Sequence, residues 1–268
     1  MAVAGSPIRS LDHLAWPAVE SAAARPGSTV IWPIGAIEQH GPHLPLGTDG
    51  LFADRVLDAV LERLPPALPI WRLPLATPGF SPEHRGFPGT LSLGADLLIA
   101  QVKAVGRDLA SAGFERLVLF NGHGGQIALL QVAARELREL EPRLAVFPTF
   151  LWSGAEGLAS LVPASEWEQG LHAGLLETSL MLHLAPELVG DVRPAGGQLD
   201  QPAPTGWSLE GALPTAWFTR DLSGNGVIGD PAEADARLGA QVCERLVQGW
   251  CQRLQALLAS DWPPRHDM

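Results

Sequence analysis

The sequence predicts an α/β fold with a mostly parallel central sheet that helices cover on both faces. Short apolar runs alternate with longer stretches whose apolar residues recur at helical spacing. This strand–helix order favours parallel strands, because each helix carries the chain back across the sheet. With 268 residues the chain can bury a sizeable core, and we expect residues 1–268 to form one domain.

Each predicted strand is a short apolar run that ends at turn or loop residues. The strands are expected over Thr29–Ala36, Ile70–Leu75, Arg116–Phe120 and Leu144–Phe150. The second strand leads into a long loop, Ala76–Thr90, which is rich in proline, glycine and charge. Loops of that length in compact domains are often functional.

The predicted helices have apolar faces and recognisable ends. They are expected over Asp49–Leu64, Asp96–Ala112, Gln126–Leu140, His172–Leu184 and from Asp230 to about Ser260. The inward residues of the first helix are Leu51, Phe52, Val56, Leu57, Val60 and Leu61. Pro65-Pro66 ends this helix, and Gly113 ends the second at the usual C-terminal position.

Residues 193–229 carry four prolines and seven glycines ahead of the last helix. Few apolar residues recur at a regular spacing there, so we expect a loop excursion or a subunit contact rather than a domain. Asp230 is expected to cap the helix that follows, with Pro231 in its first turn.

Composition excludes several classes of partner. The formal charge of −11 argues against nucleic acid, because phosphate binding requires a basic face, whereas clustered acidic residues suit cations. No apolar run approaches the ~20 residues of a membrane helix, and residues 1–28 show no secretory signal, so we expect a cytoplasmic protein. Cys243 and Cys251 fit neither a disulfide framework nor a zinc knuckle and are expected to be buried thiols.

The most informative segment, residues 38–49, follows the first predicted strand. Glu38 and His40 stand two apart, which puts both side chains on one side of an extended segment. Asp49 begins a helix, where a carboxylate is favoured. Carboxylates and imidazoles together suit divalent cations, and Zn, Mn and Fe all accept this mixture. The alternative is that Asp49 only caps the helix and that His40 lies at the surface.

A second segment, Asn121-Gly122-His123-Gly124-Gly125, follows the third predicted strand and opens a helix. Its glycines let the backbone turn sharply and approach whatever His123 holds. A phosphate cradle at the helix N-terminus is the competing interpretation. It is weak, because no lysine follows and an imidazole stands at the centre of the segment.

His172 and Glu177 are further candidates. They are five positions apart, or about 500° of helix rotation, so they diverge by roughly 140° if both are helical. They converge only if His172 lies at or before the first turn. The alternative is a pair of polar residues on a solvated helix face.

Two residues of the long loop are candidates for substrate contact. Ser81 is expected to hydrogen-bond the substrate, and His84 to line the pocket or a neighbouring subunit. A structural tie within the loop is the alternative. The histidines without partners nearby in sequence are expected to be structural or exposed; these are His13, His183 and His266.

Four separated motifs together resemble the creatininase (creatinine amidohydrolase) family. They are Glu38-Gln39-His40-Gly41-Pro42-His43-Leu44-Pro45 with Thr48-Asp49, Glu83-His84 with Phe87-Pro88-Gly89-Thr90, Asn121-Gly122-His123-Gly124-Gly125, and His172-Ala173-Gly174 with Glu177-Thr178-Ser179. Their order and intervals match over roughly residues 10–190. The set is specific, although each motif alone is weak.

The resemblance implies a three-layer α/β/α fold, a homohexamer built as a trimer of dimers, and two divalent metal ions. It also implies that a metal-activated water hydrolyses a C–N amide, lactam or formamide bond. Carried over position by position, Glu38 and His123 would hold one metal, His40 would hold the second, and Asp49 would bridge them. His172 would transfer a proton.

The third motif departs from creatininase itself. That enzyme has a substrate-contacting aromatic residue and a metal-binding glutamate where this chain has Gly124 and Gly125. We therefore expect Glu177 to complete the second metal site and to act in catalysis together with His172. Gly124 is expected to lie at the substrate. Relatives with the Gly-Gly form include a formylaminopyrimidine deformylase and the peptidase of the mycofactocin pathway, so creatinine is not the expected substrate. A non-catalytic small-molecule-binding module with a structural metal is the alternative.

Overall fold

The predicted strands form a four-stranded parallel sheet in the computed structural model, which describes residues 9–194, 203–211 and 213–263. They are β1 (Thr29–Ile34), β2 (Ile70–Arg72), β3 (Arg116–Asn121) and β4 (Ala145–Phe150), in the spatial order β2-β1-β3-β4. β1 pairs with β3 along its whole length, from Thr29 opposite Arg116 to Ile34 opposite Asn121. The chain therefore changes its direction of travel across the sheet between β1 and β3.

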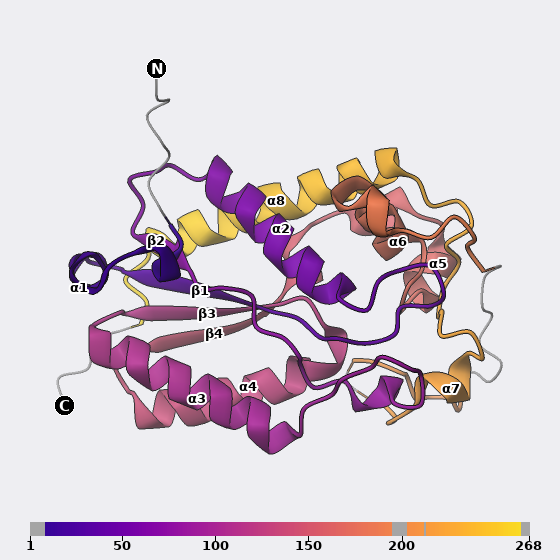
Figure 1. Cartoon of the computed structure of the whole chain (residues 1–268), viewed down its shortest axis with the longest axis horizontal. Helices are drawn as coiled ribbons and strands as arrows, with labels where there is room; N and C mark the ends of the chain where they lie inside the picture. Colours follow the sequence, from indigo (N-terminus) through magenta and orange to yellow (C-terminus); the bar gives the residue numbers. More distant parts are fainter. Residues whose placement is uncertain (1–8, 195–202, 212, 264–268) are drawn as a thin grey trace.

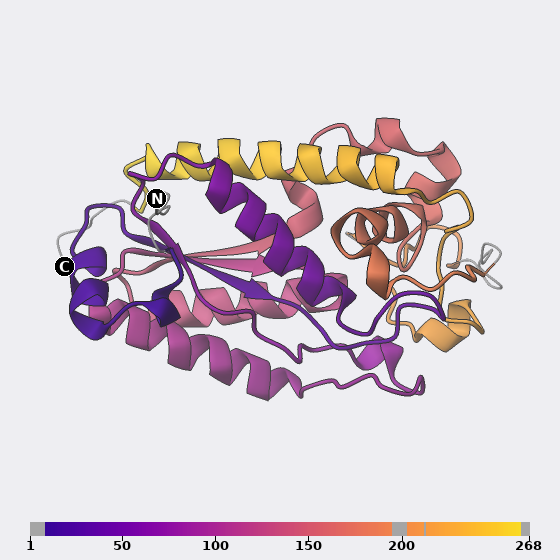
Figure 2. The same ribbon diagram turned by 45° about the horizontal axis from the view of Figure 1, so that its top comes forward.

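Helices cover both faces of the sheet, as predicted. On one face lie α2 (Thr48–Arg63), α6 (Leu175–Leu184) and α8 (Ala236–Leu258), and on the other lie α3 (Ala95–Ala112) and α4 (Ile127–Leu140) (Figures 1 and 2). α1 (Trp16–Ala23) lies near the amino ends of the strands, whereas α5 (Ala164–Gln169) and α7 (Thr219–Leu222) lie beyond their carboxyl ends. This is the expected three-layer α/β/α arrangement.

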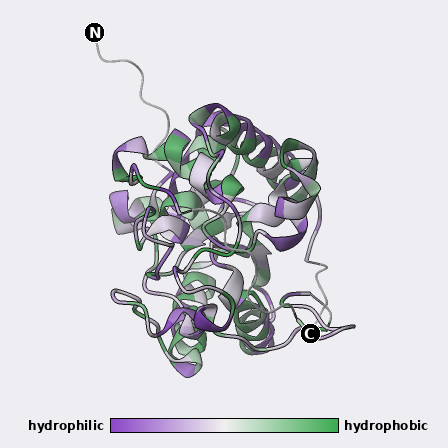
Figure 3. Cartoon of the chain, turned by 90° about the vertical axis from the view of Figure 1, so that its right-hand side faces the viewer, coloured by the Kyte–Doolittle hydropathy of each residue, from purple (hydrophilic) through white to green (hydrophobic). Residues whose placement is uncertain are grey.

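Alternate side chains of the central strands enter two separate cores. Val30 and Trp32 of β1 pack with residues of α3 and α4, whereas Ile31 packs with residues of α2 and α8. The same alternation occurs along β3, because successive residues of a strand point to opposite faces. Around the helices, hydrophobic and hydrophilic residues alternate, as amphipathic helices on a sheet require (Figure 3).

Short 3-10 turns connect several of these elements. They occupy Leu11–His13, Pro82–His84, Gly124–Gln126, Leu151–Gly154, Leu158–Leu161 and Pro186–Leu188. β2 ends at Arg72 rather than at Leu75, because Pro74 has no N–H to donate to a neighbouring strand. The helices α1, α5 and α7 were not predicted from the sequence.

The start of the last helix differs from the prediction. α8 begins at Ala236, and its N-cap is Asp235, whose carboxylate accepts from the N–H groups of Arg237 and Leu238 at 2.7 and 2.8 Å. The Asp230 carboxylate accepts instead from the N–H of Ala232 at 3.0 Å. Asp230 therefore forms a turn ahead of the helix, and the prediction that it caps the helix was wrong.

Several residues expected to lie outside the site can now be placed. Cys243 and Cys251 are free and buried in α8, as predicted. His13 and His183 are exposed, as predicted, and His266 lies outside the described residues. None of the helices in the described ranges combines the length and apolarity that crossing a bilayer requires.

Candidate metal centre

The candidate ligands converge at the carboxyl ends of β1 and β3, between which the chain changes direction. Glu38 and His40 lie on the loop after β1, Asp49 is the second residue of α2, and His123 follows β3. Open α/β sheets bind ligands at such a switch point, because the loops from neighbouring strands separate there. No more than 3% of any of these four residues is exposed. We call these residues, with His172 and Glu177, the centre.

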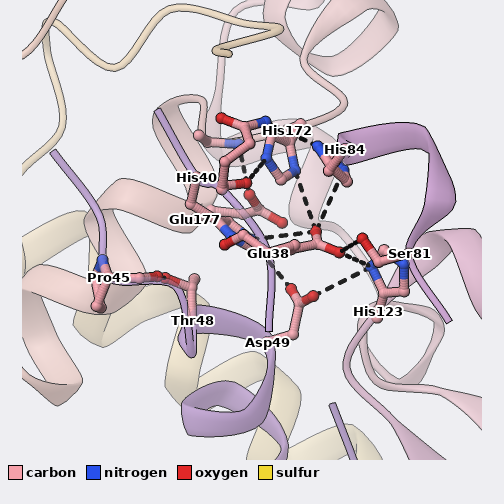
Figure 4. A network of polar contacts seen from close by, with 12 residues as sticks. Glu38, His40, Pro45, Thr48, Asp49, Ser81, His84, His123, His172 and Glu177 are labelled. Atoms are coloured by element: carbon pink, nitrogen blue, oxygen red, sulfur yellow. Dashed lines mark hydrogen bonds and ion pairs between the residues drawn. The ribbon is translucent and has the colours of Figure 1, made fainter. Parts of the chain in front are cut away.

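Asp49 lies between two imidazoles. Its Oδ1 is 3.2 Å from Nε2 of His40, and its Oδ2 is 3.1 Å from Nδ1 of His123 (Figure 4). Oε2 of Glu38 is 3.2 Å from the same His123 nitrogen, and Oε1 of Glu38 is 3.9 Å from Nε2 of His40. Each carboxylate therefore approaches both histidines.

Glycines allow the start of α2 to approach the ends of both strands. A Cβ on Gly35, after β1, would lie 2.5 Å from the Cα of Gly50. A Cβ on Gly122, after β3, would overlap the carbonyl oxygen of Asp49. Any larger residue at either position would push α2 away, and the Asp49 carboxylate would then leave the two imidazoles.

The loop that carries His123 is fixed by side-chain amides. Oδ1 of Asn121 accepts from the His123 N–H at 2.9 Å and from Nε2 of Gln126 at 2.8 Å. Oε1 of Gln126 accepts from the N–H of Phe80 at 3.0 Å, which ties this loop to the one after β2. The His123 N–H is thus already paired, and the carboxylates of Glu38 and Asp49 face the ring, so the arrangement opposes a phosphate cradle.

His172 and Glu177 converge because His172 is not helical. α6 begins at Leu175, and His172 instead forms backbone hydrogen bonds with Ile228, donating at 2.9 Å and accepting at 2.8 Å. Ala173 has a φ of 54°, a left-handed conformation that is uncommon for residues other than glycine. This turn directs both side chains to the centre: Nδ1 of His172 lies 3.8 Å from Oε1 of Glu38, and Glu177 lies beside His40.

The loop after β2 contributes three side chains. Ser81 donates a short hydrogen bond to Oε2 of Glu38, and Nε2 of His84 lies 3.3 Å from Oε1 of Glu38. Oε1 of Glu83 lies 3.0 Å from Nε2 of His123. Ser81 and His84 are fully buried against Glu38, and their contact with substrate stays a prediction.

The part of the chain before α8 forms a wall of the centre beside His84. Nε2 of Gln39 donates to Nδ1 of His84 at 2.8 Å and to the carbonyl of Gly226 at 3.0 Å, and Oγ1 of Thr219 lies 2.8 Å from the same His84 nitrogen. An amide nitrogen can only donate, so Nδ1 of His84 accepts. The His84 proton therefore lies on Nε2, which faces Glu38.

The carboxylates raise the pKa of the imidazoles between them. Burial lowers the pKa of His40, but the carboxylates of Asp49 and Glu38 outweigh it and raise this pKa to about 9. Burial opposes protonation of His123 too, yet Glu38 and Asp49 raise its pKa well above the ordinary value. Burial raises the pKa of Asp49, but the two imidazoles hold it below its usual range. The acidic side chains thus attract positive charge to the centre.

The pKa values of His172 and His84 are lowered and that of Glu177 is raised, so each of these three side chains favours its neutral form. Burial lowers the pKa of His172 well below its ordinary value, and the neighbouring His40 and His84 lower it further. Burial also lowers the pKa of His84, and it raises the pKa of Glu177 to about 7. His172 is therefore a neutral imidazole at neutral pH.

The donor atoms of the centre fit a divalent cation. Within the described ranges, Oε1 of Glu38 and Oδ2 of Asp49 are buried without a hydrogen-bond partner. Bonds of about 2.0–2.2 Å to a cation place neighbouring ligand atoms about 2.8–3.6 Å apart, from octahedral to tetrahedral angles. The 3.1 and 3.2 Å separations around Asp49 fall in this interval.

Among the residues that the structure describes, the donor atoms form three groups, and the atoms within each lie within 4.8 Å of one another. The groups are Glu38 with His40 and His172, Glu38 with Glu83 and His123, and His40 with Asp49 and Glu177.

Among the described residues, Glu83 is a donor that was not predicted from the sequence to belong to the site. Its place next to His84 in a motif was the only signal in the sequence, and spacing along the chain could not relate it to His123. His43 belongs to the first motif but turns away, with Nε2 2.8 Å from Oγ1 of Thr178. A Cβ on Gly124 would meet no atom within 4 Å, so open space lies beside His123 there.

Comparisons with known proteins identify the family of this chain. A family model described as Creatininase: Creatinine amidohydrolase matches residues 12–254. The mycofactocin precursor peptide peptidase of Mycobacterium ulcerans (strain Agy99) is 35% identical over 244 residues, covering 89% of this chain and 87% of the relative. The creatinine amidohydrolase of Pseudomonas putida is 31% identical over 195 residues, covering 67% and 73%.

Solved creatininase structures share the fold. The structure designated Creatininase Mn has a TM-score of 0.73 at 26% identity and covers 96% of this chain and 100% of that chain. A mutant creatininase designated Zn-Zn type has a TM-score of 0.73 at 26% identity, covering 97% and 100%. With the donor groups described above, these relatives support a divalent metal at the centre. The chain therefore belongs to the creatininase family and is a hydrolase that acts on C–N bonds.

Proposed function

We propose that the centre binds two divalent ions and hydrolyses an amide-type C–N bond. Glu38 and His123 would hold one ion, His40 and Glu177 the other, and Asp49 would bridge them. The position of Asp49 carries the proposal, because its two oxygens lie 3.2 and 3.1 Å from imidazoles of two different loops. A carboxylate with a separate nitrogen ligand at each oxygen suits a pair of cations such as Zn²⁺ or Mn²⁺, with Fe²⁺ also accepted.

When bound, the two ions would act as a Lewis acid toward the substrate carbonyl and would lower the pKa of a water. Within the chain, His172 moves the proton. Its Nε2 donates to the carbonyl of Gln39 at 2.7 Å, so the neutral ring keeps Nδ1 free, and Nδ1 faces Glu38. The lowered pKa leaves this nitrogen unprotonated, so it accepts a proton and passes it to the leaving nitrogen.

Two neighbouring rings fix the position of His172. The ring centroids of His40 and His84 lie 4.2 and 4.1 Å from that of His172. Together with the backbone pairing to Ile228, these contacts hold Nδ1 of His172 toward Glu38.

We propose a peptide or a formamide as the substrate in preference to creatinine. The space beside Gly124 supports this choice, because no side chain narrows the site at that position. The relative named as a peptide peptidase also matches a larger share of this chain than the relative named as a creatinine amidohydrolase. The open space at Gly124 thus favours a substrate that extends past His123.

The resemblance also supports proposals about assembly and location. Residues 1–268 act as one domain, six copies assemble as a trimer of dimers, and the protein works in the cytoplasm. Light scattering on the purified chain tests the assembly, and a monomer with full activity would overturn it.

Metal content and turnover test the proposed function together. The protein is stripped with a chelator, reloaded with Zn²⁺ or Mn²⁺, and analysed for bound metal by elemental analysis. It is then assayed against creatinine, formamides and short peptides. We expect two ions per chain, turnover of a peptide or a formamide, and none of creatinine. Metal that stabilises the fold without turnover of any panel member would favour a non-catalytic binding module instead.

A further inference from the structure

The carboxylate of Glu83 occupies the space that a side chain at position 125 would fill. A Cβ on Gly125 would overlap Oε1 of Glu83 and would lie 2.6 Å from Nε2 of His123. A Cβ on the preceding residue, Gly124, would meet no atom within 4 Å. Glycine at position 125 therefore leaves room for the side chain of Glu83, although the backbone φ of Gly125 does not require glycine.

His123 presents its two ring nitrogens to different carboxylates. Nδ1 lies 3.2 Å from Oε2 of Glu38 and 3.1 Å from Oδ2 of Asp49, on the side where the proposed ion would bind. Nε2 lies 3.0 Å from Oε1 of Glu83, an ion-pair distance, and it is buried without a hydrogen-bond partner in the described part of the chain. The two nitrogens of an imidazole point in different directions, so Glu83 faces the nitrogen that does not face the ion.

Histidines that bind metals commonly donate the N–H of the other ring nitrogen to a carboxylate. That contact fixes the tautomer, orients the ring and makes the ligand nitrogen more basic. Oε1 of Glu83, 3.0 Å from Nε2, lies close enough to accept that N–H.

We infer that Glu83 is the positioning residue for His123, and that Gly125 is required because it makes space for the Glu83 carboxylate. Glu83 accepts the Nε2–H of His123 and so keeps Nδ1 free to bind the ion beside Glu38 and Asp49. This inference rests on the proposed function, because it assigns Glu83 a part in holding one of the two ions.

Alanine substitutions at the two neighbouring glycines test the inference without removing any acidic side chain. Gly125→Ala should displace the Glu83 carboxylate, whereas Gly124→Ala is a matched control that adds the same methyl group into open space. The affinity for Zn²⁺ and for Mn²⁺ is measured by competition with a chromophoric chelator, and the stoichiometry by elemental analysis.

We expect Glu83→Ala and Gly125→Ala each to weaken the affinity for one ion by roughly 10–100-fold. Gly124→Ala should leave both affinities unchanged. Glu83→Gln keeps an oxygen that accepts from Nε2, so it should recover most of the affinity. The variant that combines Glu83→Ala with Gly125→Ala should bind the ion no more weakly than Glu83→Ala alone, because both substitutions remove the same contact.

Other results would overturn the inference. Unchanged ion affinity in Glu83→Ala contradicts the inference. It is also contradicted if Glu83→Gln loses as much ion affinity as Glu83→Ala, because direct coordination of the ion by Glu83 would give that pattern. Circular dichroism of the metal-free variants checks folding; if Gly125→Ala does not fold, the comparison of Glu83→Ala with Glu83→Gln decides. If the wild-type chain binds no ion, the proposed function fails together with this inference. If the wild-type chain binds ions but the variants behave otherwise than expected, only this inference fails.

Discussion

Oδ2 of Asp49 lies 3.1 Å from Nδ1 of His123. Asp49 is the second residue of α2, whereas His123 follows β3. The contact joins two separate strand–helix units at the point where the chain changes direction across the sheet. It exists because Gly122 lets the Asp49 backbone approach the end of β3. The geometry of the site thus depends on where α2 begins relative to the ends of β1 and β3.

Replacing Asp49 should affect both proposed ions at once. In Asp49→Ala we expect the metal content to fall from two ions per chain to near none, because each ion loses a shared ligand. Turnover should fall by at least ~10³-fold, since the ions supply several kcal/mol of transition-state stabilisation. Elemental analysis and initial rates measure the two effects.

The matched control for Asp49→Ala is Asp96→Ala. Asp96 is the second residue of α3, as Asp49 is of α2, but it is exposed and lies on another helix. The control should keep both metal content and turnover. Full metal content in Asp49→Ala would contradict the assignment of the centre.

Loading the metal-free protein with cations should release protons. The raised pKa values of His40, at about 9, and of His123 mean that both imidazoles are protonated at pH 7.5 without a cation. A cation can bind only after these protons leave, so about two protons should be released per chain and the affinity should rise toward pH 9. Titration calorimetry in buffers of different ionisation enthalpy counts them, and an enthalpy independent of buffer would contradict the prediction.

The raised pKa of His40 should also affect the stability of the metal-free protein. The folded-state pKa of about 9 exceeds the ordinary value of 6.5, so protonated His40 stabilises the fold. This stabilisation is fully present below pH 6.5 and is lost as the pH rises through about 9. Urea unfolding between pH 6 and 10 measures it. The decline should disappear in His40→Gln, which has no titrating ring.

Glu166 should matter for turnover although it is not part of the centre. Its carboxylate accepts from the N–H of Leu175 at 2.7 Å, at the start of α6, and from the N–H of Asp230 at 2.8 Å. It therefore holds together the two segments that position His172. Glu166→Ala should cost roughly 1–3 kcal/mol of stability, because it leaves partly buried N–H groups unpaired. It should also lower kcat more than it changes KM.

Glu168→Ala is the control for this prediction, since Glu168 lies in the same short helix but is exposed. Thermal denaturation and steady-state kinetics of the two variants give the comparison. Equal kcat values in both variants would show that Glu166 has no part in positioning His172.

Gly239 in α8 should be intolerant of alanine. Intrinsic helix propensity alone favours alanine over glycine by ~1 kcal/mol. A Cβ at this position, however, would overlap the carbonyl oxygen of Ser179 in α6. We expect Gly239→Ala to destabilise the fold by roughly 1–3 kcal/mol, the usual cost of overpacking. Gly224→Ala, whose Cβ would meet no atom within 4 Å, should be close to neutral in the same denaturant titration.

Much of the fold and of the centre could be predicted from the sequence, because both depend on local patterns. The apolar periods locate the strands and most helices, and a ligand-rich segment directly after a strand must lie at the carboxyl edge of a parallel sheet. Glu38, His40, Asp49 and His123 follow two strands that turn out to be neighbours. Their convergence therefore follows from the strand order.

The features that were not predicted depend on contacts between distant segments. Asp230 and Asp235 both precede the last helix, and only packing decides which one caps it. The left-handed conformation of Ala173, on which the direction of His172 depends, has no signal in the sequence. The contact of Glu83 with His123 requires the space left by Gly125, which becomes evident only in three dimensions.

The wall beside His84 comes from a different part of the chain than the acidic ligands. Thr219 and Gly226 contribute to it, whereas the ligands follow β1 and β3. Substitutions in the segment before α8 can therefore change the surroundings of His84 while the strand ends keep Glu38, Asp49 and His123 in place.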